Sequence, residues 1–213
     1  MSNIIYKISC FFVYIFCKIF CPLRVSGLEN IRDMESCIIA SNHASFLDPP
    51  LIGLSLFPKR ISYLARDTLF KNIFFSKLIR TLYAYPIRVK SSSPRDIKNI
   101  VEIVNLKRPT LIFLEGTRTF SGDFLPPKRS LGFIAIKAGK PIVPIYIEGT
   151  FEAYSRHKRW VKRHPVKIKI GAPLHIEDLV DEGVKISENA QKVVDKVMTE
   201  IKSLKEKSSK EEA

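Results

Sequence analysis

Apolar and polar positions follow two alternating patterns after residue 34. Short, almost wholly apolar runs are typical of buried strands. Between them, apolar residues recur three and four positions apart, as on the buried face of a helix. Strands are therefore predicted at 36–41, 61–65, 110–114, 142–147 and 166–170, with a short extended piece at 85–89.

The segments between these runs predict helices. The pair Pro49-Pro50 suits a first helical turn, where no N–H partner is needed, so a helix is predicted through Leu56. Ser93 is a suitable N-cap for a helix that includes Ile97 and Val104. Gly139 is suited to end another helix, marked by Leu131 to Ala138. Helices are also predicted at 67–82, with Asp67 as N-cap, and around 193–204, followed by a frayed, charged end from Lys205 to Ala213.

Alternating strands and helices predict an α/β fold with a mostly parallel sheet flanked by helices. A chain of 213 residues is long enough for one sizeable domain. It contains no internal repeat and no linker long enough to separate two domains. We therefore expect an N-terminal helical segment over 1–25, one domain over 26–205 and a charged tail over 206–213.

Residues 4–21 are strongly apolar and aromatic, but Lys7 and Lys18 interrupt them. A helix that crosses a bilayer needs about 20 apolar residues, and only ten uncharged residues separate the two lysines. The lysines lie three helical turns apart on one face, which suits a helix lying in the membrane interface. A tilted or re-entrant span and a buried helix remain alternatives. No small-residue cleavage site of a signal peptide follows.

The composition adds a strong positive charge. The formal net charge is +14, which favours anionic partners such as nucleic acid, phosphorylated small molecules or anionic lipid. No helix-turn-helix, zinc-finger or RNA-binding signature is present, so nucleic acid is not expected as a partner. The four cysteines form no metal-type pair and are expected to be reduced thiols.

Candidate chemistry begins in the heptad Asn42–Asp48, directly after the predicted strand 36–41. A carboxylate that hydrogen-bonds one imidazole nitrogen fixes the tautomer and makes the other nitrogen a better base. His43 and Asp48 are therefore a candidate general base and its orienting partner. The alternative is a histidine that only caps the following helix.

A second group, Glu115, Gly116, Thr117 and Arg118, follows the predicted strand 110–114. Arginine at a strand's carboxyl end is placed to bind phosphate, and glutamate can accept from a hydroxyl or orient the arginine. Lys128, just before a predicted helix, suits an anion pocket. The alternatives are a tight turn with a surface salt bridge and a solvated basic loop.

Two further segments suit a membrane surface. The basic run Arg156–His164 surrounds Trp160, and tryptophan and basic residues both favour the lipid interface. The segment Leu69–Phe75 mixes aromatic residues with lysine. The alternatives are a solvated hairpin for the first segment and core packing or an acyl-chain groove for the second.

The blocks Asn42–Asp48 and Glu115–Arg118, followed by Val143-Pro144-Ile145, resemble the 1-acylglycerol-3-phosphate O-acyltransferase family. The first block matches the NHxxxxD signature in full and the second matches EGTR in full. The resemblance runs from about Ser36 to Pro173, and the segments 124–128 and 170–173 also look like the family's later segments.

The family's intermediate motif, G-x-x-F/P-I-x-R, is closest to this sequence at 83–89. Tyr83 replaces the glycine and Val89 stands at the arginine position. Arg88 or Lys90 is then left to supply the charge. The departure concerns a phosphate-binding cation and does not touch the pair His43 and Asp48.

The resemblance implies a glycerolphosphate acyltransferase-like fold with an acyltransferase domain over 26–205. It implies that a fatty acyl group passes from acyl-CoA or acyl-carrier protein to the sn-2 hydroxyl of 1-acylglycerol 3-phosphate, giving phosphatidic acid. No covalent acyl-enzyme, metal or cofactor is expected. The implied catalytic residues are His43 and Asp48, and Glu115 and Arg118 are implied to form part of the acceptor-phosphate site, with Gly116 and Thr117 inside the same motif. Arg88 and Lys128 are further expected substrate-binding residues.

The expected partners are lysophosphatidic acid, the acyl donor and a phospholipid surface, with the protein on the cytoplasmic face of the cell membrane. One alternative is acyl transfer to another lysolipid, such as lyso-ornithine lipid. Another is a non-catalytic basic protein that binds membrane or nucleic acid, which the net charge alone supports.

Overall fold

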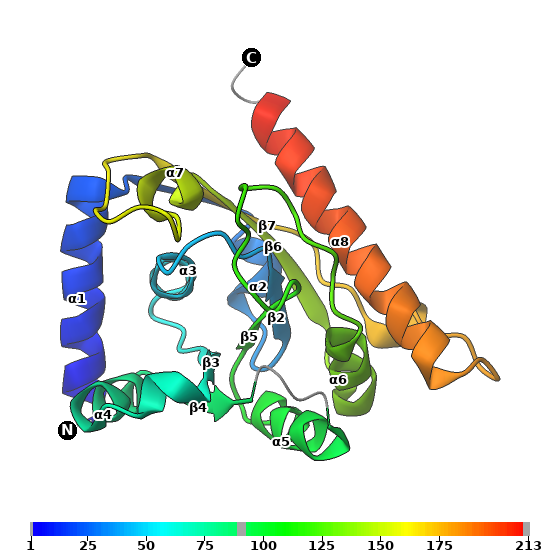
Figure 1. Ribbon diagram of the computed structural model, residues 1–213. Helices are drawn as coiled ribbons and strands as arrows, with labels where there is room; N and C mark the ends of the chain where they lie inside the picture. Colours follow the sequence, from blue (N-terminus) through cyan, green and yellow to red (C-terminus); the bar gives the residue numbers. More distant parts are fainter. Residues whose placement is uncertain (1, 89–92, 211–213) are drawn as a thin grey trace.

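The computed structural model describes residues 2–88 and 93–210 (Figure 1). Within these residues, seven strands form one sheet in the order β1-β7-β6-β2-β5-β3-β4. Neighbouring strands are parallel except β6 and β7, which are antiparallel, so the predicted mostly parallel sheet is confirmed. The strands are β1 Leu23–Ser26, β2 Ile38–Ser41, β3 Ser62–Arg66, β4 Ala84–Ile87, β5 Thr110–Phe113, β6 Ile142–Glu148 and β7 Val166–Ile170.

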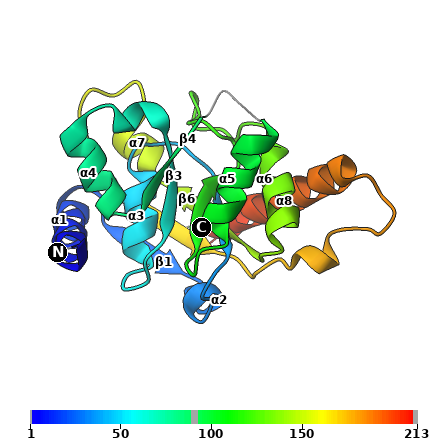
Figure 2. The same cartoon turned by 90° about the horizontal axis from the view of Figure 1, so that it is seen from below.

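Helices cover both faces of the sheet, with α1, α3 and α4 on one side and α5, α6 and α8 on the other (Figure 2). The α-helices are α1 Ser2–Phe20, α2 Glu29–Arg32, α3 Asp48–Ser55, α4 Ile73–Thr81, α5 Pro94–Val104, α6 Ser130–Ala138, α7 Thr150–Tyr154 and α8 Ile186–Lys210; the 3-10 helices are η1 Asp67–Phe70 and η2 Ile176–Asp178.

The central strand β2 is apolar except for Ser41, because both of its faces are covered. Ile38 and Ala40 pack into the core beneath α5, α6 and α8, whereas Ile39 packs into the core beneath α3. Successive side chains of a strand point to opposite faces, so a strand covered on both sides needs apolar residues throughout. The carboxyl end of β2 then leads directly into Asn42 and His43.

Several predicted boundaries are confirmed. The Ser93 side chain caps α5 by accepting from the Asp96 N–H at 3.2 Å. Gly139 ends α6 with φ of +58°, a left-handed conformation that favours glycine. The extended piece at 85–89 corresponds to β4, although Val89 and Lys90 lie outside the described residues.

The single helix predicted at 67–82 is wrong. The segment divides into η1 and α4, and Asn72 caps α4 by accepting from the Phe75 N–H at 3.0 Å. Asp67 begins η1 but makes no side-chain cap, since the N-cap position belongs to Arg66. A polar side chain that competes for the backbone N–H groups thus divides a continuous apolar pattern.

The sequence patterns also missed β1, α2 and α7. The prediction that the chain frays from Lys205 onward is wrong for residues up to Lys210, because α8 continues through them. Ser208 is fully buried and donates a hydrogen bond to Glu148 Oε1 at 2.6 Å. Lys205 lies over the Phe124 ring, 5.2 Å from its centroid. The charged end of the helix is therefore held against β6 and the loop before α6.

The helix α1 is docked on one side and exposed on the other. Tyr6 and Cys17 are buried, and the Tyr6 ring lies 5.9 Å from that of Tyr83. Arg60 lies over the Tyr6 ring and donates to the Tyr83 hydroxyl at 2.9 Å. Within the described chain, no helix combines the length and hydropathy required to cross a bilayer. The exposed apolar residues of α1 are Ile4, Ile5, Ile8, Phe11, Phe12, Tyr14, Ile15, Ile19 and Phe20.

Close contact between α6 and α8 predicts that Gly132→Ala destabilises the fold. A β-carbon at Gly132 would lie 2.1 Å from the Ala190 carbonyl oxygen, so the helices would have to separate. We expect a loss of about 1–3 kcal/mol in the free energy of unfolding, measured by denaturant titration. Lys137→Ala, at an exposed position of α6, is the control. Equal stability of the two variants would contradict the tight contact.

Candidate active site

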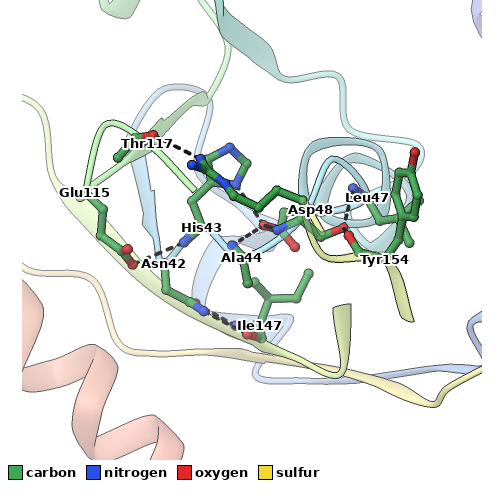
Figure 3. Close-up of polar contacts among 11 residues, drawn as sticks. Asn42, His43, Ala44, Leu47, Asp48, Glu115, Thr117, Ile147 and Tyr154 are labelled. Atoms are coloured by element: carbon green, nitrogen blue, oxygen red, sulfur yellow. Dashed lines mark hydrogen bonds and ion pairs between the residues drawn. The ribbon is translucent and has the colours of Figure 1, made fainter. Parts of the chain in front are cut away.

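The loop between β2 and α3 brings His43 and Asp48 together (Figure 3). The His43 Nδ1 atom lies 2.8 Å from Asp48 Oδ2. The same oxygen accepts from the backbone N–H groups of Ala44 at 2.7 Å and Ser45 at 2.8 Å. Asp48 is fully buried at the start of α3, where helix N–H groups favour a negative charge. The carboxylate therefore fixes both the loop and the imidazole.

The pairing determines which ring nitrogen can act as a base. An ionised carboxylate only accepts hydrogen bonds, so Nδ1 of His43 carries the hydrogen and Nε2 is left with its lone pair. The Phe113 ring stacks on the imidazole, with centroids 3.8 Å apart and planes inclined by 10°. Ring stacking and the Asp48 bond together hold the orientation that a general base needs.

Glu115 is bonded to the backbone of two loops. Its buried carboxylate accepts from the backbone N–H groups of His43 at 3.2 Å and Leu125 at 3.3 Å. The Thr119 N–H also donates to the His43 carbonyl at 2.9 Å. These bonds join the loops that follow β2 and β5. Burial raises the pKa of Glu115 to about 7, against the lowering effect of the two backbone bonds.

Most of the predicted substrate-binding residues line one cavity of about 740 Å³ beside His43. Glu115 is not among the lining residues, and its carboxylate instead bonds to the backbone of the loops after β2 and β5. The apolar part of the lining comes from the sheet, α5 and α6. The polar lining includes His43, Gly116, Thr117, Arg118, Arg88 and Lys128, joined by Arg66 and Arg156; the apolar wall includes Leu64, Ile97, Ile100, Ile112, Leu114, Leu131 and Ile134.

Two arginines of the cavity lie over aromatic rings. The Arg118 guanidinium lies 3.4 Å from the centroid of Phe46, and that of Arg156 lies 3.8 Å from the centroid of Phe120. Arg156 Nη2 also donates to Thr117 Oγ1 at 3.5 Å. Burial lowers the pKa of Arg118, and the positive charge of Arg156 adds to that effect. The guanidinium groups are therefore close enough to repel each other.

Sequence reasoning missed Arg66 and Arg156 as residues of this site. Arg156 was interpreted as part of a membrane-binding run, and no role was given to Arg66. Both nevertheless lie near strand ends: Arg66 ends β3, and Arg156 follows β6 by way of α7. The rule that ligands bind beyond the carboxyl ends of parallel strands contained the signal that could have found them.

A histidine paired with a buried carboxylate, beside a cluster of cations on a parallel sheet, suits an enzyme that activates a hydroxyl near an anionic group. A family model described as Acyltransferase matches residues 22–148 and includes both loops. The chain belongs to this Acyltransferase family and is an acyltransferase.

Individual relatives agree with this assignment. The chain is 29% identical to the 1-acyl-sn-glycerol-3-phosphate acyltransferase of Bacillus subtilis, over 73% of this chain and 75% of that protein. It is 33% identical to the Cocos nucifera enzyme of the same name, over 76% of this chain and 53% of that protein, so it spans about half the coconut protein's length.

A solved structure confirms the fold. The crystal structure of the 1-acyl-sn-glycerophosphate acyltransferase PlsC from Thermotoga maritima superposes with a TM-score of 0.74 at 25% identity. The match covers 97% of this chain and 79% of that one. The predicted family resemblance and the α/β fold with flanking helices are both confirmed.

The raised pKa of Glu115 predicts a pH-dependent stability. The folded protein keeps the proton while the unfolded chain loses it, so stability falls as the pH rises from about 4.5 to about 7. Glu115→Gln removes this titration and leaves one backbone N–H without its acceptor. We expect the wild type to be more stable at pH 4.5 and its advantage to shrink by pH 7.5, as measured by unfolding titrations. A constant difference across this range would contradict the assignment.

Proposed function

We propose that the protein transfers a fatty acyl group from a thioester donor to the sn-2 hydroxyl of lysophosphatidate, forming phosphatidic acid. One observation carries the proposal: a single cavity combines His43, a group of cations and an apolar wall. These three features suit the hydroxyl, the phosphate and an acyl chain of the reactants. The names of the relatives support the same substrate and product.

The proposed chemistry begins when His43 Nε2 accepts the proton of the sn-2 hydroxyl. The hydroxyl oxygen attacks the thioester carbonyl, and the tetrahedral intermediate collapses to the ester as the carbon–sulfur bond breaks. The imidazolium returns its proton to the departing thiolate. Asp48 orients the ring and stabilises the imidazolium. This direct transfer requires no covalent acyl-enzyme, metal or cofactor.

The proposed donor is acyl-CoA or acyl-carrier protein, which present the same thioester to His43. The cations favour the dianionic phosphate of lysophosphatidate over the zwitterionic head group of lyso-ornithine lipid, whose net charge is near zero. The paired base His43 and Asp48 supports a catalytic role over that of a non-catalytic basic protein.

We further propose that the exposed sides of α1 and α4 bind the cytoplasmic face of a phospholipid membrane, where both acyl donors are found. Phe11 and Phe12 of α1 are 60% and 66% exposed, and Ile73 and Phe74 of α4 are 80% and 87% exposed. Clustered exposed apolar residues favour a lipid interface. Leu69 of η1 lines the cavity, so this surface continues to the substrate site.

The general-base role predicts that His43→Ala lowers phosphatidic acid formation by about a hundredfold or more. The assay supplies lysophosphatidate and acyl-CoA to washed membranes that contain each variant. His175→Ala is the matched control, because His175 is exposed and lies away from the cavity lining. Turnover by His43→Ala close to that of the wild type would refute the mechanism.

The membrane proposal predicts that Phe74→Asp weakens binding to vesicles containing anionic phosphatidylglycerol by about tenfold, since burial of one phenylalanine is lost. Sedimentation with vesicles measures the change. Val184→Asp, at another exposed apolar position before α8, provides the control. Equal binding of the two variants would remove α4 from the membrane-binding surface.

A further inference from the structure

Arg156 lies in the cavity although it belongs to neither of the two signature blocks. We propose that Arg118 and Arg156 together grip the terminal phosphate of the acceptor, and that Arg156 selects acceptors bearing a phosphate monoester. This inference rests on the proposed function for the acceptor. It assigns the selection of that acceptor to a side chain from the loop that follows α7.

The two guanidinium groups are held in a way that leaves them able to bind an anion. The Arg118 guanidinium lies over the Phe46 ring, 3.4 Å from its centroid, and the Arg156 guanidinium lies over the Phe120 ring, 3.8 Å from its centroid. An aromatic face holds a guanidinium plane without neutralising its charge, whereas a carboxylate partner would occupy the N–H groups along its edge. Ring contacts therefore orient both cations and preserve their donors.

Within the described part of the chain, only the electrostatic effect of Asp48 opposes the positive charges around Arg118. Arg118 and Arg156 form no salt bridge there, and Arg118 Nη1 and Arg156 Nε are buried without a hydrogen-bond partner. Burial lowers the pKa of Arg118, and the positive charges of Arg156 and Arg66 lower it further, whereas the Asp48 carboxylate raises it. Such an arrangement is unfavourable alone and becomes favourable when an anion enters.

The chemistry of the group favours a dianion. Each guanidinium can donate two parallel hydrogen bonds to phosphate oxygens, so two of them match a terminal phosphate with three free oxygens. A phosphodiester has one negative charge and only two free oxygens. Arg88 is exposed, whereas Arg156 is partly buried and lies over the Phe120 ring, so Arg156 is the better positioned second cation.

The hydrogen bonds of the loop that carries Arg118 also fix the position of the phosphate relative to His43. Thr117 accepts from Arg156 and belongs to the same loop as Arg118. Thr119 of that loop donates to the His43 carbonyl at 2.9 Å. A phosphate held by the two arginines is therefore fixed relative to His43, as required for placing one hydroxyl next to Nε2.

The test compares Arg156→Gln with wild type, using lysophosphatidate and 1-monoacylglycerol, which lacks the phosphate. Equilibrium binding in mixed micelles is measured together with KM and kcat for acyl transfer. We expect the Kd and KM for lysophosphatidate to rise about ten- to a hundredfold, with kcat changed much less. Binding of 1-monoacylglycerol should not change. Arg156→Lys, which keeps the positive charge but loses the two parallel N–H donors of the guanidinium, should give an intermediate Kd.

Arg24→Gln removes an equal charge from an exposed position on the edge strand β1 and should leave every constant unchanged. An unchanged Kd for lysophosphatidate in Arg156→Gln overturns the inference. Equal losses for both lipids also overturn it, because Arg156 would then only hold the loop. Phosphate-dependent binding by wild type without any acyl transfer would instead overturn the proposed function and leave the grip of Arg156 intact.

Discussion

A single buried carboxylate oxygen organises the site. Oδ2 of Asp48 receives three donors, one from the His43 ring and two from the backbone of Ala44 and Ser45. The oxygen bends the chain between β2 and α3 and at the same time orients the imidazole. Structure and chemistry are therefore coupled in one group, because the bonds that shape the loop also fix the basic nitrogen.

The strand order explains why residues distant in sequence surround this group. His43 follows β2 and Arg118 follows β5, which are adjacent at the centre of the sheet. The outer neighbours of this pair are β6 and β3, which deliver Arg156 and Arg66. Because these four strands are parallel, their carboxyl ends share one edge of the sheet. Arg118 from the adjacent strand β5, together with Arg156 and Arg66 from beyond β6 and β3, therefore lies on the same side of the sheet as His43.

Sequence reasoning reached the parts of this arrangement that depend on local pattern. The apolar runs of β2 and β5 are visible in the sequence, and the contact between His43 and Asp48 spans only five positions. The edge strand β1 was missed because its four residues alternate between half-buried and exposed and pair only with β7. The ring contact of Arg156 and the backbone bonds of Glu115 depend on how separate loops meet, which no local pattern contains.

The docking of α1 has a consequence for the molecule as a whole. Tyr6, packed with Arg60 and Tyr83, prevents the helix from rolling about its axis. Cys17 and Cys21, buried against the sheet's core, fix its other end. A surface that engages the outer side of α1 therefore sets the tilt of the entire sheet, so the mouth of the cavity keeps one constant angle and height above that surface.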